Sequence, residues 1–269
     1  MPNKKLLTYQ KMKPGHLRFE LDLSQLYNSK DQLMRFKTRF KEFIKSDPSN
    51  MHIYRLKENL LIFKSEQLIP SKGDSRPPLL LVFGNPASHS VKEGMFFSYE
   101  GNGKEHRFWK DIMRPSKMLD MGLDQDQSFK ERNRLRKEKI RNLDYKSPYR
   151  IGFCVFVSLP SGPSGPWSGI GGINKLLGLK AMKMLEPFER RRILRIVKNF
   201  ITPEGKVVTF QKNAWVGLKG DSDPVYSIKS AKTGGLVGSI NGMPKIPLLG
   251  APPTRLVGLC RRILGRFLI

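Results

Sequence analysis

The stretch that decides the fold runs from residue 79 to residue 86 and reads LLLVFGNP. Its first five residues form an uninterrupted apolar run, and the turn-forming residues Gly84, Asn85 and Pro86 close it. A short apolar run that ends in this way is typical of a central parallel strand buried on both faces. We therefore expect a buried strand over 79–83 and a loop that begins at Gly84.

Two further apolar runs have the same character, at residues 151–157 and 207–210, and a weaker one lies at residues 246–249. A stretch with helical spacing, 182–200, precedes the third strand. Strands that alternate with helices indicate a parallel sheet covered by helices on both faces. The sequence thus predicts an α/β fold, a three-layer α/β/α arrangement around a central, mostly parallel four-stranded sheet.

In sheets of this kind, ligands bind beyond the carboxyl ends of the strands, where the loops converge. The four loops concerned begin at Gly84, Ser158, Gln211 and Gly250. The loop over 158–172 is rich in Gly, Pro and Ser, and a long loop directly after a buried strand is more often functional than passive. We expect the functional site among these loops.

The 269 residues, 39% of them hydrophobic, can support one large domain or two small ones. We expect a single domain over 1–269 with two additions. The first is an N-terminal helical extension over about 1–50, indicated by apolar residues at helical spacing between Leu26 and Phe43. The second is a charged helical insertion over about 116–147, which is either a solvated helix or a phosphate contact.

The charge points to a polyanionic partner. Lys and Arg number 49 against 23 Asp and Glu, so the net charge is +26, which exceeds what solubility requires. Nucleic acid is the leading partner class, with DNA first and RNA as an alternative. A ribosome-associated protein or one bound to an anionic membrane surface is the competing interpretation, because charge alone does not distinguish one polyanion from another.

The two cysteines and four histidines never fall at metal-ligand spacing, so we expect neither a metal nor another cofactor. Two lone cysteines suggest buried thiols in a reducing compartment. No window approaches the roughly 20 apolar residues of a membrane span, and no signal peptide is apparent. We expect a cytoplasmic monomer without membrane contact.

The segment that follows the first strand carries a recognisable set of residues. They are Asn85-Pro86, Gly94, Phe97 and Arg107-Phe108-Trp109. As a set they resemble the first motif of the mismatch-specific thymine/uracil branch of the uracil-DNA glycosylase superfamily, in which Gly-x-Asn-Pro follows the first strand and Arg-Phe-Trp opens a helix. The fold that this resemblance implies is the uracil-DNA glycosylase-like α/β/α sandwich.

The resemblance also assigns roles in the site. The side-chain carbonyl of Asn85 would orient the attacking water, a weak activation because an amide cannot take the proton. Phe97 would stack on the flipped base, with Phe96 beside it, and Gly84 and Pro86 would complete the base-binding loop. Without the motif, Asn-Pro reads as a strand-terminating turn and the two rings as ordinary core.

Three more residues of these loops are candidates. Ser158 stands where some branches of the superfamily place an Asn that reads the edge of uracil. Ser88 and His89 lie in the same loop as Asn85, and either could donate a hydrogen bond to a phosphate or to the base. A solvated loop position is the competing interpretation of His89.

The last loop, residues 251–256, resembles the second motif of the superfamily. Pro253 and Thr254 match its Pro-Ser, but Pro252 stands where relatives have His or Asn, so a donor that steadies the departing base is missing. Thr254 and Arg255 would lie on the loop that enters the duplex, where Arg255 fills the vacated space or binds phosphate. Alternatively, Arg255 joins a basic C-terminal helix.

The resemblance implies a monofunctional DNA glycosylase that hydrolyses the N-glycosidic bond of uracil or a related damaged or mismatched base, leaving an abasic site for base excision repair. Such enzymes need no cofactor. Pro252 favours the alternative, a non-catalytic glycosylase-like protein that binds DNA or RNA. A third reading is a basic RNA- or ribosome-associated protein in which the motif is fortuitous.

Overall fold

The computed structural model describes residues 5–12, 16–100, 103–124 and 126–268. The chain forms two compact units, each assembled from three segments. Unit 1 comprises Met1–Gln67, Asn85–Phe96 and Val157–Arg191, and unit 2 comprises Leu68–Gly84, Phe97–Phe156 and Arg192–Ile269. The single domain expected over 1–269 stays a prediction.

Unit 1 is built on an antiparallel sheet in the order β1-β2-β4-β3. Its strands are β1 (Leu7–Lys11), β2 (His16–Asp22), β3 (Tyr54–Lys57) and β4 (Leu60–Glu66). Alternate residues of β2 are buried, as expected of a strand with one face on the core. Phe19 of β2 stacks on Phe63 of β4 with ring centroids 5.1 Å apart.

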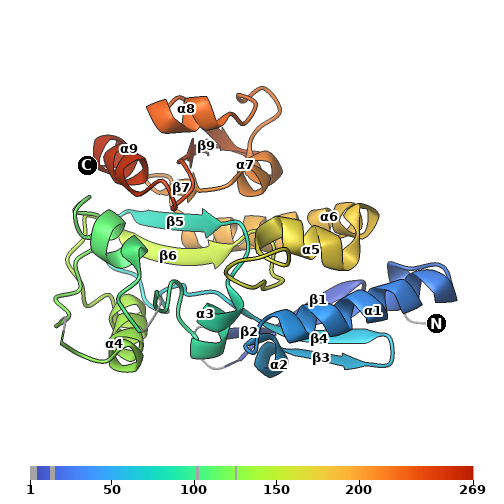
Figure 1. Ribbon diagram of the computed structural model, residues 1–269. Helices are drawn as coiled ribbons and strands as arrows, with labels where there is room; N and C mark the ends of the chain where they lie inside the picture. The colour runs from blue at the N-terminus through green and yellow to red at the C-terminus, as the bar shows by residue number, and fades with distance from the viewer. Residues whose placement is uncertain (1–4, 13–15, 101–102, 125, 269) are drawn as a thin grey trace. The chain divides into compact units, whose positions relative to one another are not determined.

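The helical extension expected over about 1–50 is therefore only partly helical. Its helix is α1 (Lys30–Ser46), which begins after the N-cap Ser29 and buries Phe36, Phe40 and Phe43. Figure 1 shows α1 lying along the antiparallel sheet. The strands β1 and β2 were not predicted, although the apolar residues of β2 alternate with polar and charged ones as in a strand with one buried face.

The other helical elements of unit 1 are short. They are η1 (Leu23–Gln25), α2 (Asn50–Ile53), α3 (Ser88–Glu93) and α5 (Gly169–Leu177). The longest helix, α6 (Leu179–Phe200), begins in unit 1 and continues into unit 2.

In the described part of the chain, unit 2 holds a five-stranded sheet in the order β6-β5-β7-β9-β8. Its first four strands are parallel: β6 (Arg150–Val155), β5 (Pro78–Phe83), β7 (Lys206–Thr209) and β9 (Met243–Gly250). These are the four strands expected from the sequence. The fifth, β8 (Val237–Ile240), pairs antiparallel with β9 and was not expected.

The α/β class and the mostly parallel sheet are thus confirmed, while the sheet has five strands rather than four. β8 escaped the sequence reading because it is a four-residue edge strand, VGSI, of which only Ile240 is buried. The central strand β5 is buried at every residue, as its apolar run predicts.

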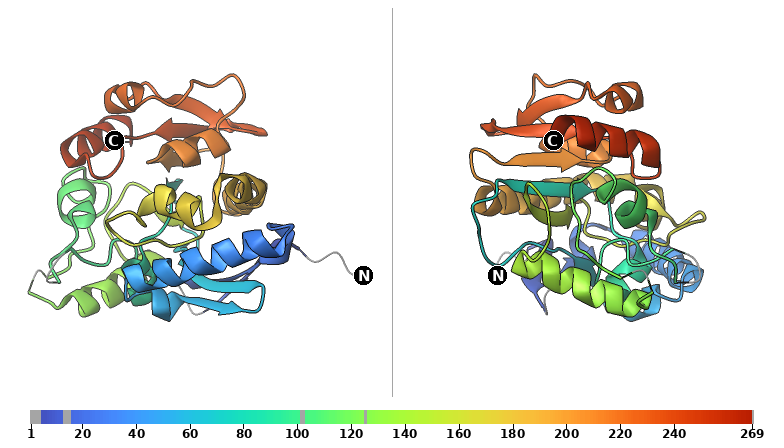
Figure 2. Two further views of the ribbon diagram at one scale, coloured as in Figure 1. Left: turned by 45° about the vertical axis from the view of Figure 1, so that its right-hand side comes forward. Right: turned by 90° about the vertical axis from the view of Figure 1, so that its left-hand side faces the viewer.

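The helical elements of unit 2 are η2 (Phe108–Met113), α4 (Phe129–Asn142), α7 (Lys212–Leu218), α8 (Ile228–Thr233) and α9 (Val257–Leu268). The helix α4 falls inside the charged insertion expected over about 116–147. The C-terminal helix α9 contacts η2, and Figure 2 shows the two side by side. Among the described residues, no helix combines the length and the apolar character that crossing a membrane requires.

Candidate functional site

Asn85 lies two residues after β5 and is held by its side-chain amide. Its Nδ2 donates to Oγ of Ser161 at 2.9 Å, to the carbonyl of Leu159 at 3.3 Å and to the carbonyl of Pro86 at 3.4 Å. Acceptors that surround one end of an amide identify that end as the NH2 group. The Oδ1 atom therefore points away from them, as an acceptor held in one orientation.

The loop that anchors Asn85 is itself tied to the start of α3 by main-chain hydrogen bonds. Ser88 N donates to the Ser161 carbonyl at 2.8 Å, and Ser161 N donates to the Pro86 carbonyl at 3.0 Å. The buried Tyr54 hydroxyl donates to the Pro160 carbonyl at 2.6 Å. Burial raises the pKa of Tyr54 well above its ordinary value, so the phenol stays a donor.

Ser88 and Ser158 are both fully buried and engaged inside unit 1. The Ser88 hydroxyl donates to Oδ1 of Asn50 at 2.6 Å. Ser158 donates through both its backbone N and its hydroxyl to Oε1 of Glu189, a buried carboxylate of α6. In this conformation neither hydroxyl is presented to a ligand, so the roles expected for Ser88 on DNA and Ser158 on the base stay predictions.

The remaining candidates of unit 1 differ in exposure. His89 is half-buried on α3, Pro86 is buried in the anchored loop, and Phe96 is 3% exposed. A ring as buried as that of Phe96 packs in the core, which is the alternative to base stacking that the sequence left open. The buried Glu189 was not expected, because in the sequence it is one of two acids in a helix rich in lysine and arginine, and no local pattern marks it as buried.

In unit 2, Phe97 has a left-handed backbone with φ 50°, an outlier for a bulky side chain. The ring is half-buried and stacks on Phe108 with centroids 4.1 Å apart. The indole Nε1 of Trp109 donates to the Phe97 carbonyl at 2.9 Å. The Phe-Trp pair that belongs to the first motif therefore holds Phe97 in this conformation.

Gly84 packs against the side chain of Gln211. Gln211 lies two residues after the end of β7. A Cβ atom on Gly84 would lie 1.8 Å from Oε1 of Gln211, so the amide occupies the space that a side chain at 84 would need. Gln211 is half-buried. The sequence marked this residue only as the start of a loop, because nothing in the pattern predicts that it reaches the neighbouring strand.

The last loop follows β9, and Ala251 N donates to the Thr209 carbonyl at 2.8 Å. Pro252 is buried, Pro253 and Thr254 are half-buried, and Arg255 is exposed. Burial raises the pKa of Tyr226, and the positive charge of Arg255 partly offsets this rise. Pro252 brings no side-chain donor and no N–H to this loop.

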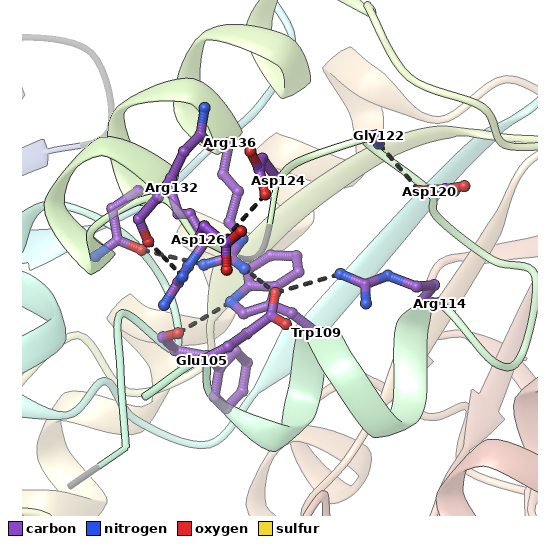
Figure 3. A network of polar contacts seen from close by, with 12 residues as sticks. Glu105, Trp109, Arg114, Asp120, Gly122, Asp124, Asp126, Arg132 and Arg136 are labelled. Atoms are coloured by element: carbon purple, nitrogen blue, oxygen red, sulfur yellow. Dashed lines mark hydrogen bonds and ion pairs between the residues drawn. The ribbon is translucent and has the colours of Figure 1, made fainter. Parts of the chain in front are cut away.

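A separate polar network joins η2 to α4, as Figure 3 shows. Glu105 pairs with Arg136, which is 2% exposed, and with Arg114 at 3.5 Å. The Arg136 guanidinium also lies over the Trp109 ring, 5.1 Å from its centroid. These groups line a cavity of about 20 Å³, enough for about one water molecule.

The expected site residues thus fall into two groups. In unit 1, Asn85, Pro86 and Ser88 surround Ser161. In unit 2, Gly84 and the loop after Gly250 follow strands on either side of β7, at the carboxyl edge of the parallel sheet. No cluster of three or more His, Cys, Asp or Glu side chains that could hold a metal ion occurs among the described residues.

The chain matches no protein-family model, and a search of curated proteins found no significant match.

Proposed function

We propose that this chain is a DNA glycosylase of the uracil-DNA glycosylase type, which hydrolyses the N-glycosidic bond of uracil or a related damaged or mismatched base. The observation that carries the proposal is Asn85, whose amide is fixed through Nδ2 so that Oδ1 has one orientation. An oriented acceptor of this kind is what a water-positioning residue requires.

In the proposed reaction a water molecule adds to C1′ of the deoxyribose as the bond from C1′ to the base nitrogen breaks. The sugar carries positive charge in the transition state, the base leaves with the bonding electron pair, and the proton of the water ends on the base. Asn85 would accept a hydrogen bond from the water and thereby aim it. Since an amide cannot take the proton, turnover should be slow.

Recognition of the base supports the same proposal. A base within a duplex must be flipped out before hydrolysis, and an aromatic ring commonly stacks on it. Phe97 is a half-buried ring held in a strained backbone conformation, which is the condition in which an outlier suggests a function. The proposal includes the three-layer α/β/α arrangement of the superfamily, which the parallel order β6-β5-β7-β9 supports.

DNA is the proposed macromolecular partner. The net charge of +26 favours a polyanion, and Arg255 is exposed on the loop that resembles the second motif. We expect affinity for duplex DNA to fall steeply as salt rises, because each neutralised phosphate releases counterions.

The second candidate is a glycosylase-like protein that binds nucleic acid without cleaving it. Two observations favour it: Pro252 supplies no donor for the departing base, and the Ser158 hydroxyl is occupied by Glu189. In this alternative the excess positive charge and Phe97 keep their roles, while Asn85 has none in hydrolysis.

The test uses labelled oligonucleotides that carry uracil opposite guanine, uracil opposite adenine, or uracil in a single strand, followed by alkaline cleavage of abasic sites. We expect strand breaks with the wild type and a loss on the order of 100-fold in Asn85→Ala. Asn199→Ala, exposed on α6, is the matched control and should keep full activity. Salt-sensitive binding without strand breaks would reject the glycosylase and leave the non-catalytic protein.

A further inference from the structure

Gln211 lies where two parallel strands end together. It follows β7, the strand that pairs with both β5 and β9. Its side-chain amide is packed against Gly84 at the end of β5, close enough that a Cβ atom there would lie 2.4 Å from Cδ and 2.9 Å from Nε2. The carboxyl edge of the sheet therefore presents an amide at the position where ligands of parallel sheets bind.

The Oε1 and Nε2 atoms of Gln211 are available to hydrogen-bond a ligand. Gln211 is the N-cap residue of α7, yet its side chain does not cap the helix, and no described residue hydrogen-bonds its Oε1 or Nε2. An amide carries two donor hydrogens and a carbonyl acceptor. A half-buried polar group without a protein partner at a ligand-binding edge is a candidate for binding a ligand.

An aromatic cluster lies on the same edge of unit 2. The ring of Phe83, next to Gly84, stacks on Phe210, next to Gln211, with centroids 4.8 Å apart. Phe97 also contacts this cluster, its ring 5.0 Å from that of Phe83. A ring for stacking and an amide for hydrogen bonding are the two elements by which proteins read a flipped base.

We propose that Gln211 reads the polar edge of the base, an inference that rests on the proposed function. Nε2 of Gln211 donates to O4 of uracil or thymine, and Oε1 accepts from its N3–H, so that the amide and the base form two parallel hydrogen bonds. Gly84 has no side chain because the amide needs that space. Ser158, the reader expected from the sequence, is committed to Glu189 instead.

The competing explanation is that Gln211 only fills space over Gly84. The two explanations separate when the base is changed together with the residue. The probe pair is a duplex with 2′-fluoro-deoxyuridine, whose glycosidic bond resists hydrolysis, and the same duplex with a 2-pyrimidinone base, which lacks both O4 and N3–H. Gln211→Leu keeps the bulk of the side chain but removes both hydrogen-bonding groups.

We expect the wild type to bind the uracil duplex at least tenfold more tightly than the pyrimidinone duplex. Gln211→Leu should bind both about equally, with unchanged affinity for unmodified DNA. Gly84→Ala should behave in the same way, because the new Cβ displaces only the flexible end of Gln211. Gln10→Leu, exposed on β1, is the control and should keep the preference.

The outcomes separate this proposal from the glycosylase itself. If the wild type excises uracil and Gln211→Leu keeps the wild-type preference for uracil over pyrimidinone, Gln211 does not read the base while the glycosylase stands. If nothing is excised but the preference depends on Gln211, base reading stands and hydrolysis is rejected. A wild type without any preference overturns the assignment of Gln211.

Discussion

Phe97 combines an unusual backbone conformation with a proposed role in stacking on the base. A bulky residue in the left-handed region costs on the order of 1–3 kcal/mol and persists only where its surroundings hold it. Here Trp109 bonds the carbonyl and Phe108 stacks on the ring. The same contacts leave the ring half-buried, so the strained backbone presents an aromatic surface instead of hiding it.

The first prediction concerns this ring. Phe97→Leu should lower single-turnover excision of uracil by about 10- to 100-fold, because stacking of a base on an aromatic ring contributes about 1–3 kcal/mol. Phe188→Leu, a half-buried ring of α6 outside both motifs, should leave the rate unchanged. Rates that fall equally in both variants, or in neither, would contradict the stacking role.

Sequence reasoning at this scale reached the residues that a motif marks and no others. Asn85, Gly84 and Phe97 were named because their spacing resembles a family pattern. Gln211 and Glu189 were not named as site residues, because their roles depend on which strand or loop lies opposite them. Local sequence spacing does not predict contacts between distant segments. The buried state of Ser88 and Ser158 likewise follows from tertiary contacts.

At the scale of elements, α4 shows why a charged helix is difficult to interpret from sequence. The charge of α4 fits both a solvated helix and a phosphate contact. The helix nevertheless has a buried face, which consists of Arg132, Asn133, Arg136 and Ile140. Burial lowers the pKa of Arg136 from 12.5 to about 10, while the nearby Glu105 opposes this shift. Arg136 is therefore still charged at neutral pH and depends on that carboxylate.

The second prediction tests this dependence. Glu105→Gln should lower the free energy of unfolding by about 3 kcal/mol, because it leaves Arg136 buried without its carboxylate. Glu131→Gln removes a pair with the exposed Arg134 on the same helix and should cost much less, because solvent screens an exposed ion pair. Urea denaturation followed by circular dichroism measures both, and equal losses would show that the buried pair contributes no more than the surface pair.

The parallel strands of unit 2 were predicted and the antiparallel strands of unit 1 were not, because the two kinds of strand differ in sequence pattern. Strands buried on both faces, such as β5, are continuous apolar runs that stand out in any sequence. β2, which has one solvent-facing side, alternates apolar with polar or charged residues, while in β4 four apolar residues are followed by Lys64, Ser65 and Glu66. The edge strand β8 depends on β9 for its existence and has little apolar character of its own.

At the scale of the whole molecule, the two cysteines report on unit 2. Cys154 lies in β6 and Cys260 in α9, and burial raises the pKa of each thiol from 9.0 to about 12. Between those two values the native state holds more protons than the unfolded chain, so this contribution to stability is complete below pH 9 and is lost as pH rises toward 12. At pH 8 both thiols should stay protonated and unreactive until unit 2 opens.

The last prediction uses these thiols to test the single domain. Each unit consists of three chain segments, and α6 runs from one unit into the other. Unfolding of one unit would therefore release the ends of the segments that form the other. We expect thiol labelling at pH 8, which reports unit 2, and hydrogen exchange of the β2 and β4 amides, which reports unit 1, to share one urea midpoint. Two separate midpoints would show that the units fold independently and that 1–269 is two domains.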